Sequence, residues 1–70
     1  MFHRFSIGSL VRHKETNEDA KVLRTFVQSG IPMYEVKIPV DQTSWQMGTK
    51  VVTEWKDSDL VASQNEGLKY

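Results

Sequence analysis

Residues 33–40 read Met-Tyr-Glu-Val-Lys-Ile-Pro-Val, and this stretch decides the fold class of the chain. Bulky apolar side chains occupy every second position: Tyr34, Val36, Ile38 and Val40. The positions between them include Met33, Glu35 and Lys37. Alternation of this kind, rich in β-branched and aromatic residues, is typical of a strand buried on one face. Pro39 lacks a backbone N–H and therefore predicts an edge or a bulge near the end of this strand.

Outward from this strand, three further stretches are short and apolar: residues 7–13, 20–27 and 49–55. In the last of them, alternation predicts one face made of Val51, Thr53 and Trp55. The sequence Ser-Gly-Ile-Pro at 29–32 predicts a turn that joins residues 20–27 to the central strand. These features together indicate several short strands joined by turns and loops.

Residues 20–27 allow two interpretations. Asn17-Glu18-Asp19 can cap a helix, and Gly30 stands where a helix would end. However, Val22, Thr25 and Val27 are strand formers. The pattern favours a strand over a helix.

The end of the chain predicts a tight turn followed by a short strand. Asp57 and Ser58 are turn and capping residues, so we expect one helical turn that folds Leu60 back into the core. We interpret the carboxylates of Asp57 and Asp59 as part of this turn and not as an acid–base pair. A brief fifth strand can follow at residues 61–62. Residues 63–70 are polar and predict a flexible tail or the start of a linker.

Length and composition exclude several classes of protein. Seventy residues provide one domain, expected over residues 1–62. Nine basic and nine acidic residues give a net charge of zero, so no overall field attracts nucleic acid or membrane. The absence of cysteine excludes disulfides, a thiol nucleophile and thiolate metal sites. No run is long enough for a transmembrane helix or a signal peptide, and we expect a soluble cytoplasmic protein.

Three segments carry a resemblance to a known group: FSIGSLVRHK at 5–14, AKVLRTFVQSGIPMYEVKI at 20–38 and EWKDSDLV at 54–61. They resemble the first strand, the central hairpin and the closing strand pair of SH3-like small barrels of the Tudor-like and KOW-like group. The resemblance covers residues 5–62 and rests mostly on hydrophobic spacing. Two departures are Ala20, where such barrels often carry glycine, and the long connection at residues 41–48.

This resemblance implies an all-β fold, a five-stranded SH3-like barrel with a short 3-10 turn before the last strand. The expected core consists of Val11, Val22, Phe26, Tyr34, Val36, Ile38, Val51, Trp55 and Leu60. Similar domains bind peptide tails, nucleic acid or neighbouring domains, and the group is not known for catalysis. Fold analogy does not identify the ligand.

No residue pattern for catalysis is present, so we expect a non-enzyme without cofactor. The only histidines are His3 and His13, and a metal held by them would need further ligands. We therefore expect no metal site. An aromatic cage for methylated lysine would draw on Phe26, Tyr34, Trp45 and Trp55, but the core needs Tyr34 and Trp55.

Basic residues in the first half of the chain predict an alternative nucleic-acid site. This basic strip comprises Arg4, Arg12, Lys14, Lys21 and Arg24. If the first two strands pair, Arg12 and Arg24 can lie near one another, and a strip of cations can bind a phosphate chain despite zero net charge. The other interpretation is a solvated surface of mixed charge.

Trp45 and Met47 predict a protein-binding patch. Both lie in the polar connection 41–48, where an exposed tryptophan and methionine can anchor a partner. The alternative is that the loop folds back and Trp45 covers an open end of the barrel. On this basis the chain is expected to be a non-catalytic module that mediates protein–protein interaction. Nucleic-acid binding and self-association are the alternatives.

Overall fold

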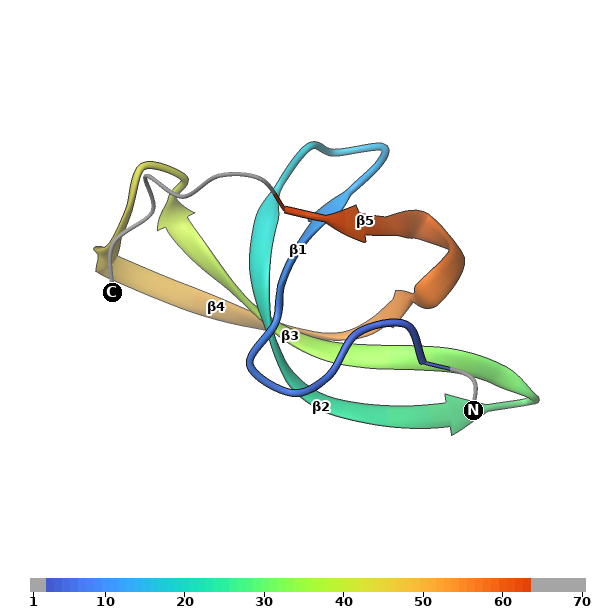
Figure 1. Ribbon diagram of the computed structural model, residues 1–70. Coiled ribbons are helices and arrows are strands. Elements are labelled where there is room, and N and C mark those ends of the chain that lie inside the picture. The colour runs from blue at the N-terminus through green and yellow to red at the C-terminus, as the bar shows by residue number, and fades with distance from the viewer. Residues whose placement is uncertain (1–2, 64–70) are drawn as a thin grey trace.

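The computed structural model describes residues 3–63, which form strands joined by short turns (Figure 1). The elements in chain order are β1 (Leu10–His13), β2 (Asp19–Gln28), β3 (Ile31–Asp41), β4 (Ser44–Lys56), the 3-10 helix η1 (Asp57–Asp59) and β5 (Leu60–Ala62). The strands make one five-stranded sheet in the order β4-β3-β2-β1-β5, and every neighbouring pair is antiparallel. The predicted all-β fold with a 3-10 turn before the last strand is confirmed. Residues 20–27 are strand, as the pattern favoured.

The sheet is bent but not closed. β2 curves from its place beside β1 toward the β2–β3 hairpin, which projects away from β1 and β5 (Figure 1). Within residues 3–63, β4 and β5 are the two edges and do not pair with each other. β1 has only four residues and β5 only three, so the β1 end of the sheet offers few backbone groups for closure. The predicted closure into a barrel is therefore not found in this part of the chain. The predicted tail begins at Ser63, which is held to β1 because its backbone N–H donates to the carbonyl of Leu10 at 3.1 Å. The rest of that tail, residues 64–70, lies outside the described residues.

The core lies on the inner face of this bent sheet. Its buried cluster consists of Val11, Ala20, Val22, Tyr34, Val36, Ile38, Trp55 and Leu60, and Phe5 and Val52 pack against it from their partly buried positions. The predicted core is confirmed except for Phe26 and Val51, and Ala20 was missed. Both wrong assignments have the same physical cause, which is a β-bulge that reverses the alternation along a strand.

In β2 the extra residue is Leu23. Val22 is paired with Val36, whereas Arg24 is already paired with Glu35. Beyond this bulge Thr25 faces inward opposite Tyr34. Phe26, opposite Met33, therefore lies on the outer face.

In β4 the bulge includes Thr53 and Glu54. Val52 pairs with Val36, and Trp55 pairs with Tyr34, so three positions of β4 span two of β3. Val52 and Trp55 consequently share the inner face, and Val51 turns outward with 55% of its surface exposed. A strand without the bulge would have placed Val51 beside Trp55, as the sequence pattern predicted.

The far end of β3 also departs from regular pairing. Pro39 pairs with Thr49 and Asp41 pairs with Ser44, so β4 carries extra residues between them. The pairing of β2 with β3 stops at Lys21 and Lys37, which leaves Pro39 with β4 alone as a neighbour. The bulge and edge position predicted from Pro39 are confirmed.

The β2–β3 turn and the end of β3 depart from the expected local structure. Ser29 and Gly30 both have positive φ, at 53° and 78°, and form a two-residue hairpin turn. Ile31 and Pro32, predicted as part of that turn, belong to β3. Val40, predicted to be buried, is exposed because β3 extends past the core at this end.

Candidate functional site

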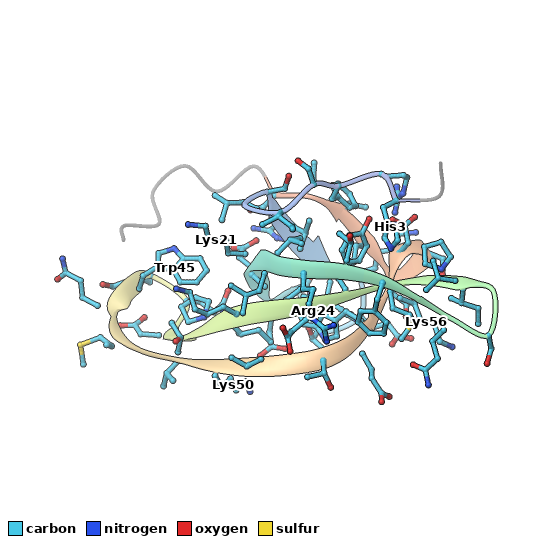
Figure 2. All side chains as sticks on the ribbon, turned by 90° about the horizontal axis from the view of Figure 1, so that it is seen from below. His3, Lys21, Arg24, Trp45, Lys50 and Lys56 are labelled. Atoms are coloured by element: carbon cyan, nitrogen blue, oxygen red, sulfur yellow. The ribbon has the colours of Figure 1, made fainter. Side chains whose placement is uncertain are left out.

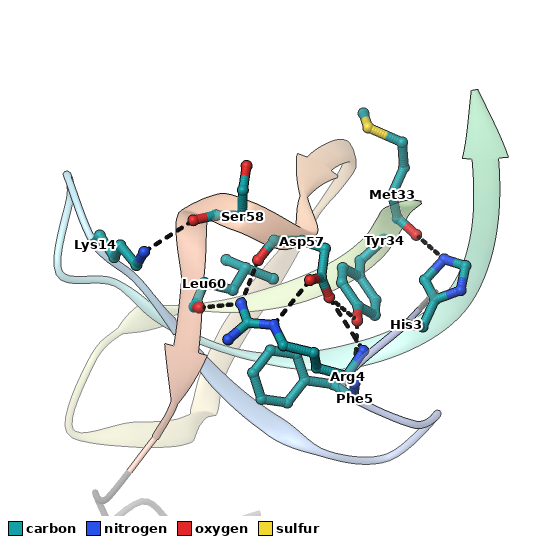
Figure 3. Close-up of polar contacts among 9 residues, drawn as sticks. All are labelled: His3, Arg4, Phe5, Lys14, Met33, Tyr34, Asp57, Ser58 and Leu60. Carbon is teal, nitrogen blue, oxygen red and sulfur yellow. Dashed lines mark hydrogen bonds and ion pairs between the residues drawn. The ribbon is translucent and has the colours of Figure 1, made fainter. Parts of the chain in front are cut away.

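Arg4, Tyr34 and Asp57 form a polar cluster that fastens the N-terminal segment to η1 (Figure 3). The Asp57 carboxylate accepts hydrogen bonds from Arg4 Nε at 2.8 Å, from the Arg4 backbone N–H at 3.2 Å and from the Tyr34 hydroxyl at 2.5 Å. Arg4 Nη2 donates to the backbone carbonyls of Asp57 and Leu60. We call this set the N-terminal clamp. Asp57 was predicted to cap the turn, but η1 has no side-chain capping bond and the carboxylate binds Arg4 and Tyr34 instead.

The clamp shifts the ionisation of its two acidic groups. Burial acts to raise the pKa of Asp57, but the hydrogen bonds from Tyr34 and Arg4 outweigh it and hold that pKa below its ordinary value of 3.8. Burial and the Asp57 carboxylate raise the pKa of the Tyr34 hydroxyl above its ordinary value of 10.0. At neutral pH the cluster is therefore a carboxylate held by a guanidinium and a neutral phenol, which is the arrangement of a structural tie.

A second polar cluster joins β1, β2 and the β3–β4 turn. Arg12 binds the Asp19 carboxylate through two nitrogens, Nε at 3.0 Å and Nη2 at 3.3 Å. The Ser63 hydroxyl donates to the same carboxylate at 2.9 Å, and the Asp19 backbone N–H donates to the side-chain oxygen of Gln42 at 2.7 Å. Arg12 and Asp19 are also directly opposite one another in the β1–β2 ladder.

The structure does not assemble the predicted basic strip. Arg4 and Arg12 are engaged by Asp57 and Asp19, as described above. Lys14 Nζ donates to the carbonyl of Ser58 at 2.9 Å, and Arg24 Nε lies 3.4 Å from a Glu35 oxygen.

Lys21, the remaining member of the predicted strip, lies opposite another lysine. It lies on β2 directly opposite Lys37 of β3, and sequence reasoning had not singled out Lys37 as a site residue. Only the strand register, which is not visible in the sequence, could have paired these two cations.

Trp45 and Met47 differ strongly in solvent exposure. Trp45 is only 6% exposed, whereas Met47 is 68% exposed. The Lys37 ammonium lies 5.8 Å from the centroid of the Trp45 ring, and this tryptophan is not part of the main core cluster. The expected exposed patch is therefore not formed by these two side chains. The folded-back alternative describes Trp45 better, because the irregular pairing beyond Pro39 lets the start of β4 fold back.

The four aromatic residues considered for a cage do not converge. Tyr34 and Trp55 belong to the core cluster, Phe26 lies on the outer face of β2, and Trp45 lies beside Lys37.

Each histidine has a structural contact. His3 Nε2 donates to the carbonyls of Phe26 at 2.8 Å and Met33 at 3.1 Å. His13 Nδ1 accepts the backbone N–H of Glu15 at 3.2 Å, and its ring packs 4.9 Å from Trp55. Residues 3–63 contain no group of three or more histidine or acidic side chains placed to hold a metal ion. The same part of the chain has no helix with the length and hydropathy of a membrane span.

A groove on the outer face lies where the β2–β3 hairpin extends past the end of β4. It has a volume of about 220 Å³ and is lined by Gln28, Ser29, Ile31, Met33, Glu54 and Lys56. Met33 is buried and Ile31 is exposed, so apolar side chains are flanked by a polar and charged rim. We call this the hairpin groove. The hairpin groove was not predicted from the sequence, because Ile31 was assigned to the turn and Met33 to the side of its strand opposite the buried face.

A larger hollow of about 540 Å³ lies beside the N-terminal segment. It is lined by His3, Arg4, Phe5, Ser6, Ile7 and Thr25. Two of the polar side chains in its wall already have partners within the chain, since His3 binds backbone carbonyls and Arg4 binds Asp57. The hairpin groove is therefore the better candidate for a ligand from outside.

No family model matches the chain, and no curated protein or solved structure matches it.

Proposed function

We propose that this chain is a non-catalytic protein-interaction module of the SH3-like kind, which docks a segment of a partner protein in the hairpin groove. The strand order and the 3-10 turn before β5 support the SH3-like assignment. The groove supports the binding role. An apolar centre with a polar rim is the general anatomy of a protein interface.

The observation that carries the proposal is the exposure of apolar side chains on the projecting hairpin. Ile31 is exposed on the same face as the buried Met33, two positions away along β3, whereas Val27, the partner of Pro32, is exposed on the opposite face of the hairpin. Because Met33 pairs with Lys56, the last residue of β4, no strand within residues 3–63 neighbours the hairpin beyond that pair on the β4 side. A partner side chain can therefore contact Ile31 and Met33 without displacing any part of the described sheet.

Self-association through the β4 edge receives less support. Extra residues between Trp45 and Gly48 interrupt the edge, and the bulge at Thr53 and Glu54 interrupts it again. Bulges and lysines are features that prevent edge strands from pairing with other chains, and Lys50 lies in the short regular segment between them.

A peptide-display experiment tests the proposal. A random peptide library panned on the wild-type chain should enrich ligands whose binding is lost in Ile31→Ser and kept in Val61→Ser. Val61 is a matched control because it is 38% exposed on β5, compared with 40% for Ile31. Equal loss in both variants, or selection of no ligand at all, would contradict docking in the hairpin groove.

A further inference from the structure

The hairpin groove carries one acidic and one basic side chain on its β4 wall. Glu54 and Lys56 both line the groove, and both are exposed. They flank the buried Trp55, so the alternation of a strand directs both of them to the outer face. Among the described residues, neither side chain takes part in an ion pair. The groove therefore presents one carboxylate and one ammonium group to a ligand.

A neighbouring pair of charges on the outer face is already neutralised. Arg24 Nε lies 3.4 Å from an oxygen of Glu35, which is two positions from Met33 along β3. Figure 2 shows Lys56 at the hairpin end of the sheet and Arg24 nearer its middle, with Trp45 toward the opposite end. The open charges that a ligand meets in the groove are therefore those of Glu54 and Lys56.

The strand register fixes the order of three contact points along the groove. Met33 pairs with Lys56, and β3 runs antiparallel to β4. Ile31 lies two positions before Met33 on the same face, so it lies beyond Lys56 in the direction in which β4 runs. A ligand that follows β4 therefore meets the Glu54 carboxylate first, the Lys56 ammonium second and the apolar side chain of Ile31 last.

We propose that the segment docked in the hairpin groove is an extended chain in which alternate residues are basic, acidic and apolar, with the acidic residue in the middle. Its basic residue faces Glu54 and its acidic residue faces Lys56. Its apolar residue packs on Ile31 and Met33. This inference rests on the docking function proposed above and specifies the chemistry of the docked segment.

The geometry of an extended chain matches this arrangement. Alternate side chains of a strand point to one side at a spacing of roughly 7 Å, which is also the spacing of Glu54 and Lys56 along β4. The acidic residue stays in the middle whichever way the segment runs, so the charge order does not depend on the direction of the segment. Direction therefore does not weaken the prediction.

A ligand of uniform charge fits the groove less well. A purely acidic segment or a nucleic acid is attracted by Lys56 and repelled by Glu54, and a purely basic segment meets the reverse. Complementary charges contribute more to specificity than to raw affinity, so we expect the order of charges to select among segments that share the same apolar residue.

The test compares two capped peptides of identical composition, titrated into the whole chain. In the first peptide, alternate residues are lysine, glutamate and leucine with threonine between them. In the second peptide, the lysine and the glutamate are exchanged. The NMR signals of the Lys56 backbone amide and the Ile31 methyl groups follow binding. The wild type should bind the first peptide about fivefold more tightly, because the second replaces two partly exposed ion pairs with like-charged contacts.

A charge-exchanged variant provides the matched control. Glu54→Lys combined with Lys56→Glu keeps the net charge and the amino-acid composition of the chain, and it leaves the apolar side chains of the groove unchanged. This variant should prefer the second peptide by a similar factor. Its melting temperature establishes that it is folded.

Three results would overturn the charge pattern. They are equal affinity of the wild type for both peptides, an unchanged preference in the charge-exchanged variant, and the absence of shifts with either peptide at millimolar concentration. Panned ligands separate this failure from failure of the docking function. Ligands that need Ile31 but bind the charge-exchanged variant as tightly as the wild type would overturn the charge pattern and leave docking in the hairpin groove intact.

Discussion

Two cross-strand pairs on the outer face, two residues apart along β2, differ in the charges that they bring together. Asp19 faces Arg12 across the β1–β2 ladder, and Lys21 faces Lys37 across the β2–β3 ladder. The first pair joins opposite charges, with two hydrogen bonds and a carboxylate that is almost fully buried. The second joins like charges beside an indole. The first arrangement stabilises the fold, whereas the second places two like charges opposite one another, which destabilises an antiparallel pair.

The largest effect on this comparison is expected from removal of the indole beside Lys37. Trp45→Ala should cost about 3 kcal/mol of unfolding free energy, because a large buried side chain leaves a cavity. Urea unfolding followed by circular dichroism measures the change. An unfolding free energy close to the wild-type value would show that Trp45 contributes no packing and is available as an anchor for a partner.

Removal of the carboxylate from the Arg12 pair should have the next largest effect. Asp19→Ala leaves the Arg12 guanidinium and the Ser63 hydroxyl without that acceptor, and we expect a loss of about 2 kcal/mol. Lys37→Ala serves as the contrast and should leave thermal stability within about 0.5 kcal/mol of wild type. If both variants lose stability equally, the distinction between a stabilising pair of opposite charges and a pair of like charges fails.

The N-terminal clamp predicts how stability depends on pH. Because the folded pKa of Asp57 is below 3.8, its contribution is complete above pH 3.8 and is lost as the pH falls through the folded value. Because the pKa of Tyr34 is raised above 10.0, the folded state holds its proton more tightly and stability falls as the pH rises past 10.0.

Thermal melts across both pH ranges, with Asp57→Asn and Tyr34→Phe as comparisons, measure these contributions. Asp57→Asn should reduce the acid-dependent loss, and Tyr34→Phe should remove part of the alkaline loss. Unchanged pH profiles in both variants would show that the clamp does not couple to folding.

The smallest expected effect is a gain in stability. Lys21→Glu converts the like-charged pair with Lys37 into an opposite-charged one and should stabilise the free chain by about 0.5 kcal/mol. Differential scanning calorimetry at low salt measures the gain. A lower melting temperature would indicate that the two lysines are not in conflict in the free protein.

The candidate sites could be predicted only in part. Trp45 was identified from its place in a polar connection, but its burial depends on the irregular pairing of β4 beyond Pro39. Lys21 was identified as a cation, but its partner Lys37 is sixteen positions away in the chain. Arg4 and Arg12 were assigned to a binding strip because their carboxylate partners, Asp57 and Asp19, are brought to them only by folding.

The local sequence was sufficient to predict which residues form the strands and the hairpin turn. Period-two alternation marks β3, and Ser29 and Gly30 mark the hairpin, because backbone conformation and side-chain direction depend on neighbouring residues. The tertiary structure decided to which side of the sheet each side chain points beyond Leu23 in β2 and before Trp55 in β4. A bulge forms only when a strand is paired with another, so the resulting exchange of Val51 for Val52 and of Phe26 for Thr25 comes from pairing between distant segments.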